Sequence, residues 1–245
     1  IAKLYGTFIK SIKRYADAVV CCSYAVADAV GDLPLKTVIY DSAVFPEHAT
    51  EELKIKCEVK DIIYVGNILP GKGQALALNA LAQLIGEYPD LTLHFVGKFD
   101  NNEASVNFKR SLDALIRKKA LENHVKFEGF KFNIEKEIEK ADILLNLSES
   151  ESFSMVCLEA LKTGIPLIAS DCGGPAELFE HMKSGWLVPN KNYMAASEAL
   201  KVLIENHSLR KQFSGEGKKY VAEKFNIVKN SKILDNLYNS LLSNS

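Results

Sequence analysis

ESFSMVCLEALKTGIPLIASDCGG, residues 151–174, is the stretch that decides the fold. Its spacing predicts a loop over 148–153, a helix over 154–163 and a strand over 165–170. Gly164 suits the left-handed residue that ends many helices, so the helix is expected to stop there. A loop therefore leads into the N-terminus of a helix.

The same alternation of strand and helix continues on both sides of this stretch. Strands are predicted at 62–65, 91–96, 125–128, 142–147, 166–170 and 185–188. Helices are predicted between them at 74–85, 105–119, 135–140, 154–163 and 176–181, and amphipathic helices follow at 192–205, 208–225 and 227–242. This pattern predicts an α/β fold, namely a Rossmann-like parallel sheet with helices on both faces.

The first part of the chain has fewer elements. A helix is predicted over 1–15, a strand over 16–22, a helix that Ser23 caps and Gly31 ends, and a second strand over 35–40. These elements are too few to close a separate domain. Residues 46–60 lack a steady period and are expected to form a linker.

Two glutamates in the opening stretch suggest a ligand site. Glu151 lies in the predicted loop, and Glu159 follows more than one turn into the helix. The free N–H groups of a helix start bind phosphate, whereas a carboxylate there suits the hydroxyl groups of a sugar or a ribose. The amides of Ser152, Phe153, Ser154, Met155 and Val156 are then available for a diphosphate. The alternative is ordinary compensation of the helix dipole, and spacing alone favours that alternative.

A turn with three glycines, GNILPGKG over 66–73, closes the first strand of the predicted sheet. Ligands of open parallel sheets lie at the carboxyl ends of the strands, so Lys72 on this turn can reach a diphosphate. Neither a P-loop nor a dinucleotide-binding glycine motif is present. Taken alone, this segment is better explained as a plain turn.

Bulk properties limit the function classes. The chain has 245 residues, with 30 basic and 31 acidic side chains, so no overall positive charge favours nucleic acid. Five scattered cysteines indicate a reducing compartment and neither a disulfide framework nor a metal site. No apolar stretch is long enough to span a membrane, and no signal peptide is recognisable. A cytoplasmic location is expected, and any membrane contact is expected to be peripheral to the inner face.

The motifs together resemble family four of the retaining glycosyltransferases. The resemblance rests on ESFSMVCLEAL, TGIPLIASDCGGPAELF and SGWLVP, and it extends over about 61–225. It implies that Glu151 contacts the donor sugar and Glu159 the nucleotide ribose. The family has Gly-Phe-Gly or a near variant after the first glutamate, whereas this chain has serine at 152 and 154, which lacks glycine's freedom at positive φ.

The resemblance also assigns roles to the glycine turn and to a later segment. Gly66, Asn67 and Lys72 match the family turn whose arginine and lysine pair with the donor diphosphate, with Asn67 in the place of the arginine. A nearby cation such as Lys98 or Lys131 compensates, or leaving-group stabilisation is weaker, or the missing cation comes from the other domain. The backbone of Phe130 and Lys131 is expected to contact the nucleotide base.

The implied reaction transfers a sugar from a nucleoside diphosphate to an acceptor hydroxyl with retention, in polysaccharide or glycoconjugate synthesis. Glu151 and Lys72 are the predicted catalytic residues, with no metal and no cofactor beyond the donor substrate. The partners implied are the donor and a saccharide or lipid-linked saccharide acceptor. Two alternatives stay open: a non-catalytic nucleotide-sugar-binding module, and a nucleotide-sugar epimerase on the same architecture.

The resemblance further divides the chain into domains. Residues 1–45 are expected to be a remnant of the N-terminal acceptor domain, whose larger part is missing. Residues 46–60 form the linker, 61–225 the nucleotide-sugar-binding domain, and 226–245 a helix that crosses back to the N-terminal domain. The apolar face of that last helix is expected to be partly exposed.

Overall fold

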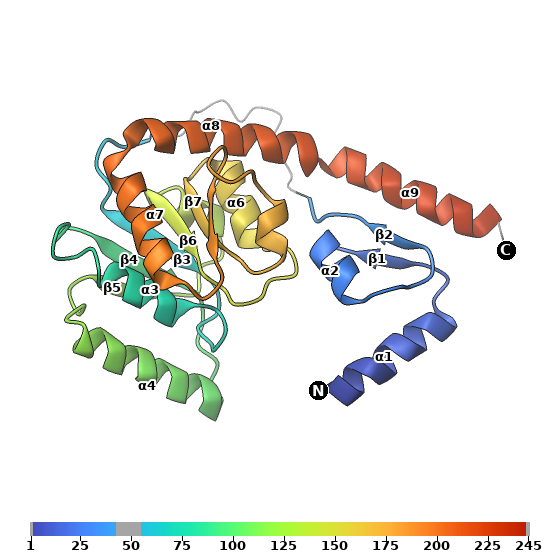
Figure 1. Cartoon of the computed structure of the whole chain (residues 1–245), viewed down its shortest axis with the longest axis horizontal. Coiled ribbons are helices and arrows are strands. Elements are labelled where there is room, and N and C mark those ends of the chain that lie inside the picture. Colours follow the sequence, from blue (N-terminus) through green and yellow to red (C-terminus); the bar gives the residue numbers. More distant parts are fainter. Residues whose placement is uncertain (1, 43–54, 244–245) are drawn as a thin grey trace.

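A six-stranded parallel sheet forms the centre of the molecule, which is described by a computed structural model over residues 2–42 and 55–243. Its strands are β3 (Asp61–Val65), β4 (Thr92–Val96), β5 (Val125–Gly129), β6 (Ile143–Asn146), β7 (Leu167–Asp171) and β8 (Trp186–Pro189). They lie in the order β5-β4-β3-β6-β7-β8, and Figure 1 labels all of them except β8. The predicted fold class is therefore confirmed.

Helices cover both faces of this sheet (Figure 1). One face packs against α3 (Gln74–Leu81), α4 (Glu103–Lys118) and α7 (Tyr193–Glu205). The other face packs against α5 (Ile134–Ile138), α6 (Met155–Thr163) and the end of α8 (His207–Lys224). Adjacent strand residues alternate between the two cores, because side chains on a strand point to opposite faces. Ile62 belongs to the first core and Ile63 to the second.

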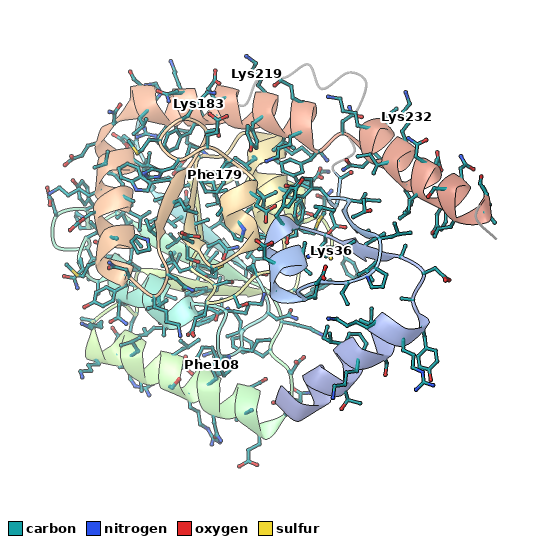
Figure 2. The ribbon with its side chains drawn as sticks, turned by 45° about the vertical axis from the view of Figure 1, so that its right-hand side comes forward. Lys36, Phe108, Phe179, Lys183, Lys219 and Lys232 are labelled. Atoms are coloured by element: carbon teal, nitrogen blue, oxygen red, sulfur yellow. The ribbon has the colours of Figure 1, made fainter. Side chains whose placement is uncertain are left out.

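The N-terminal segment contains α1 (Ala2–Tyr15), β1 (Val19–Cys21), α2 (Tyr24–Ala29) and β2 (Lys36–Val38). The two strands pair in parallel as a separate small sheet. Lys36, labelled in Figure 2, donates hydrogen bonds from Nζ to the carbonyls of Ala27 and Gly31 at 2.8 and 2.7 Å. Its charge thus stabilises the C-terminal end of α2.

The last helix, α9 (Ile227–Ser243), continues beyond α8 and passes along β1 and β2 (Figure 1). Asn230 attaches it to this segment, because its Nδ2 donates to Tyr40 O at 2.9 Å and to Ser42 Oγ at 2.7 Å. Several apolar side chains of α9 are exposed, namely Ile227, Val228, Ile233, Tyr238 and Leu242. Of the predicted linker, residues 46–54 lie outside the described part.

Two differences from the predicted elements concern the region around the site. The helix predicted over 176–181 is wrong, since the structure has a short 3-10 helix, η1 (Gly174–Glu177). Its hydrogen bonds join residues three apart, such as Leu178 N–H to Pro175 O at 3.1 Å, and His181 then forms an isolated β-bridge with Gly185, so no α-helix continues here. Ser154 is the N-cap of α6 and not its first helical residue.

Within residues 2–42 and 55–243, no helix combines the length and the apolar character needed to cross a membrane.

Candidate functional site

The strand order places the site between β3 and β6. The chain runs from β3 through β4 to β5 on one side and from β6 through β7 to β8 on the other, so the order reverses between these two neighbours. A parallel sheet opens a crevice at the carboxyl ends of such strands, and ligands bind there. Two loops border this crevice: the lysine loop, residues 66–73 after β3, and the glutamate loop, residues 147–154 after β6.

A buried tyrosine fixes the distance between the two loops. Tyr64 is 1% exposed, and its hydroxyl donates to Lys72 O at 2.5 Å while it accepts from the N–H of Leu147 at 2.8 Å. Burial raises the pKa of this phenol, so it stays a donor. Gly73 has φ 78°, and a Cβ there would lie 2.1 Å from Leu147 O. Only glycine permits this close approach of the loops.

The two loops bring the two predicted catalytic side chains into contact. Lys72 Nζ lies 2.7 Å from Glu151 Oε1, across 79 residues of sequence. The side chains are 34% and 17% exposed, respectively. Each charge therefore partly neutralises the other at the edge of the crevice, and both can also reach a ligand with hydroxyl and phosphate groups.

Ser154 forms the start of α6 in a left-handed conformation, at φ 85°. Its Oγ accepts from the N–H of Cys157 at 3.4 Å and from Asn146 Nδ2 at 3.0 Å. Asn146 is 3% exposed and also accepts from the N–H of Ser148 at 3.1 Å. Serine has less freedom than glycine at positive φ, but here its hydroxyl serves as the N-cap of α6.

The other residues of the predicted diphosphate site have different surroundings. Ser152 and Met155 are exposed, Val156 is half-buried, and Phe153 is 2% exposed inside an aromatic cluster with Tyr40 and Phe225. Since the first N–H groups of a helix have no intrahelical partner, Met155 and Val156 present free donors to the crevice. Phe153 instead anchors the loop.

Glu159 lies half-buried on α6, on the side that faces α5. Burial raises the pKa of its carboxyl group, the nearby negative charge of Glu135 raises it further, and Lys162 opposes the rise. A carboxylate desolvated in this way gains from hydrogen-bond donors such as ribose hydroxyls. This environment fits the predicted contact with the ribose, which stays a prediction.

The lysine loop leaves Asn67 exposed, and Gln74 Nε2 donates to its carbonyl at 2.9 Å. Gly66 precedes it at φ 152°. The two cations that could replace the family arginine both have an acidic neighbour. Lys98 Nζ lies 3.6 Å from Asp100, and Lys131 Nζ lies 3.9 Å from Glu128. The geometry favours neither of them.

Phe130 follows β5 and is 61% exposed, and its ring packs edge-on against the 98% exposed ring of Phe132 at 5.1 Å between centroids. Neither ring belongs to the core, although an aromatic residue after a strand usually does. The segment is free to contact a base at the C-terminal edge of the sheet. Base contact by the backbone of Phe130 and Lys131 stays a prediction.

Several residues of this site were not recognised in the sequence. Tyr64 and Asn146 lie inside strands, where each looks like any core residue. Ser23 and Glu177 belong to segments far apart in the chain. Ser23 donates to the carbonyl of Ser152 in the glutamate loop, and Glu177 accepts from the N–H groups of the two residues that follow Ser23. In the described part of the chain, no group of three or more His, Cys, Asp or Glu side chains could hold a metal ion.

Comparison by sequence finds curated proteins that are similar to this chain. The chain is 29% identical to D-inositol 3-phosphate glycosyltransferase of Corynebacterium urealyticum over 199 residues, which are 80% of this chain and 46% of that protein. It is 26% identical to N-acetyl-alpha-D-glucosaminyl L-malate synthase of Bacillus anthracis, over 78% of this chain and 48% of that protein. The chain thus spans about half the length of the curated relatives it matches.

The fold is also similar to that of the Anabaena protein Alr3699/HepE, solved in complex with UDP and glucose. The TM-score is 0.82 at 24% sequence identity, and the similarity covers 96% of this chain and 67% of that one. The family model of glycosyl transferases group 1 matches residues 47–220, most of the chain, including both loops. The chain therefore belongs to the glycosyl transferases group 1.

Proposed function

We propose that this chain contains the donor-binding part of a retaining glycosyltransferase, which transfers a hexose from a nucleoside diphosphate to an acceptor hydroxyl. The contact between Lys72 and Glu151 beside the N-terminus of α6 carries this proposal. A nucleotide sugar presents a diphosphate next to a hydroxyl-rich ring, and these loops present a cation and free amides next to a carboxylate.

The chemistry of the transfer follows from these groups. When the bond between the anomeric carbon and the diphosphate breaks, negative charge grows on the leaving oxygens. Lys72 and the N–H groups of Met155 and Val156 stabilise that charge. Glu151 accepts hydrogen bonds from the sugar and orients it, and Glu159 does the same for the ribose. The departing phosphate takes the proton of the acceptor, so no protein nucleophile is assigned.

Uridine is the proposed base, because the Anabaena neighbour was solved with UDP. The relatives named above act on an inositol phosphate and on malate, according to their names. Their acceptors differ although they match the same part of this chain. Acceptor choice is therefore proposed to lie mainly outside the donor site, and a saccharide or lipid-linked saccharide stays our proposal for it.

A second candidate is a nucleotide-sugar-binding module without transferase activity. Asn67 favours it, because an amide cannot supply the permanent charge and bidentate geometry of the arginine that the family turn usually carries. Lys72 is then the one cation of the lysine loop. Such a module would bind the donor but not break its glycosidic bond.

Turnover of UDP-glucose and UDP-N-acetylglucosamine, measured as released UDP, tests the proposal. We expect release by the parent chain, and a fall of roughly 10²- to 10³-fold in Lys72→Ala. Lys201→Ala is the control, because Lys201 on α7 forms an ion pair of the same 2.7 Å length with Glu87 in the turn that follows α3. Binding of UDP without any release would favour the non-catalytic module.

A further inference from the structure

Glu177 lies at the end of η1 in the predicted nucleotide-sugar-binding domain, residues 61–225, here called the donor domain. Its carboxylate binds the N-terminal segment. Oε1 accepts from the N–H of Ala25 at 2.7 Å, and Oε2 accepts from the N–H of Tyr24 at 3.0 Å. The hydroxyl of Tyr40 donates to Oε2 at 2.8 Å. One carboxylate thus makes three hydrogen bonds to residues at least 137 positions away in the sequence.

The backbone of Glu177 is held by α8. Lys224 of α8 donates from Nζ to the carbonyl of Glu177 at 2.9 Å, and the same Nζ donates to the hydroxyl of Tyr220 at 2.8 Å. Glu177 is therefore anchored to the donor domain through its main chain and to the N-terminal segment through its side chain. A residue held at both ends can fix the position of one part relative to the other.

The helix that Glu177 holds also touches the glutamate loop. Ser23, which is fully buried, caps α2 by accepting from the N–H of Val26 at 3.1 Å. Its hydroxyl donates in turn to the carbonyl of Ser152 at 2.5 Å. Figure 2 shows α2, which lies beside the label of Lys36, close to the donor domain. The cap of α2 and the residue next to Glu151 are thus joined directly.

The turn before η1 also contacts the glutamate loop. Gly174 donates from its N–H to the carbonyl of Glu151 at 2.9 Å. A Cβ on Gly173 would lie 2.8 Å from that carbonyl and 3.6 Å from Cβ of Ala25. The main chain at Glu151 is therefore enclosed between α2 and the turn that leads to Glu177.

We propose that Glu177 is a positioning residue for the transfer reaction: it holds α2 against the glutamate loop and thereby sets the orientation of Glu151. The catalytic consequence rests on the proposed function. That Glu177 holds α2 against the glutamate loop does not depend on it. In this proposal, Glu177 acts through α2 and the glutamate loop and makes no direct contact with the sugar or the diphosphate. Its loss should misplace a group that orients the reacting sugar, and small misplacements of this kind lower turnover strongly.

Glu177→Ala and Glu177→Gln test the proposal, with Glu180→Ala as the control. Glu180 lies three residues further on, is exposed, and pairs only with the exposed Lys183 among the described residues (Figure 2). We expect the amide hydrogens of Tyr24 and Ala25 to exchange about tenfold faster or more in Glu177→Ala. Glu177→Gln keeps one acceptor oxygen and should show a smaller increase. Exchange in the control should match the parent.

Kinetics separate positioning from general destabilisation. In Glu177→Ala, we expect kcat for UDP release to fall by about tenfold or more, with KM for the donor within about threefold, because the hydrogen bonds of Glu177 among the described residues reach neither the lysine loop nor α6. Partial recovery in Glu177→Gln is expected. Unchanged exchange at Tyr24 and Ala25, or equal kcat in parent and variant, would overturn the proposal. If the parent releases no UDP, the proposed function fails, while hydrogen exchange still decides whether Glu177 holds α2.

Discussion

Substitution of Ser154 tests how the start of α6 is built. This residue has φ 85°, a region that costs a non-glycine residue about 1–2 kcal/mol. Its hydroxyl nevertheless accepts from the N–H of Cys157 and from Asn146 Nδ2. Ser154→Ala keeps the strained backbone and loses both hydrogen bonds, whereas Ser154→Gly loses the same hydrogen bonds but relieves the strain.

The two substitutions should therefore differ in stability. Loss of the cap costs about 1 kcal/mol, and weaker pairing of the buried Asn146 amide costs about 1 kcal/mol more, since it keeps a 3.4 Å contact with the Cys157 sulfur. Ser154→Ala should thus lose about 2 kcal/mol. In Ser154→Gly, relief of about 1–2 kcal/mol offsets most of that loss. We expect the glycine variant to be the more stable of the two by about 1–2 kcal/mol.

Urea unfolding measures this difference in the free energy of unfolding, as a shift of the midpoint at an equal dependence of that free energy on urea concentration in all variants. The same two substitutions at Ser152 serve as the control, because that side chain is exposed and its backbone is not left-handed. Glycine should bring no advantage there. An alanine variant at 154 as stable as the glycine variant would refute the reasoning, because it would mean that the backbone strain contributes nothing.

Two further predictions concern neighbouring residues. Burial, and then Glu135, raise the pKa of Glu159, so the folded state holds its proton over a pH range where the unfolded state has lost it. Stability should therefore fall as pH rises from 4.5 through the raised pKa, and Glu159→Gln should flatten this part of the pH profile in urea unfolding; an unchanged profile would contradict the assignment. Gly174→Ala should lose about 1–3 kcal/mol, since its Cβ would lie 2.3 Å from Phe153 Cα, whereas Gly215→Ala meets no atom within 4 Å and should not destabilise; equal thermal midpoints for the two would contradict this.

Local patterns were sufficient to predict most of the fold. The periodicity of apolar residues placed each strand of the sheet within one or two residues, because buried strands and amphipathic helices have different spacing. The helix predicted over 176–181 failed, since a proline and two glycines impose a tight turn whose geometry depends on the adjoining glutamate loop. Tertiary contact decided that segment.

The site was predictable in its parts but not in its contacts. Glu151 and Lys72 each appeared as a candidate, yet their 2.7 Å ion pair joins residues 79 positions apart, and spacing carries no information on such a pair. The left-handed backbone at Ser154 was indicated only by the glycine that the resembling family has there, because serine itself rarely adopts this conformation. Glu177 looked like any acidic residue in a helix, and only the fold shows that its carboxylate reaches α2.

Calorimetric titration with UDP, GDP and ADP tests the central claim most directly. We expect one nucleoside diphosphate, UDP, to bind the parent, and Lys72→Ala to lose about 1–3 kcal/mol of binding free energy while Lys201→Ala matches the parent. The two ion pairs have the same length, but Lys72 borders the crevice with a partner carboxylate that is 17% exposed, whereas Lys201 lies away from it with a partner that is 55% exposed. Absence of binding by all three nucleotides, or equal affinity in both lysine variants, would contradict a donor site between β3 and β6.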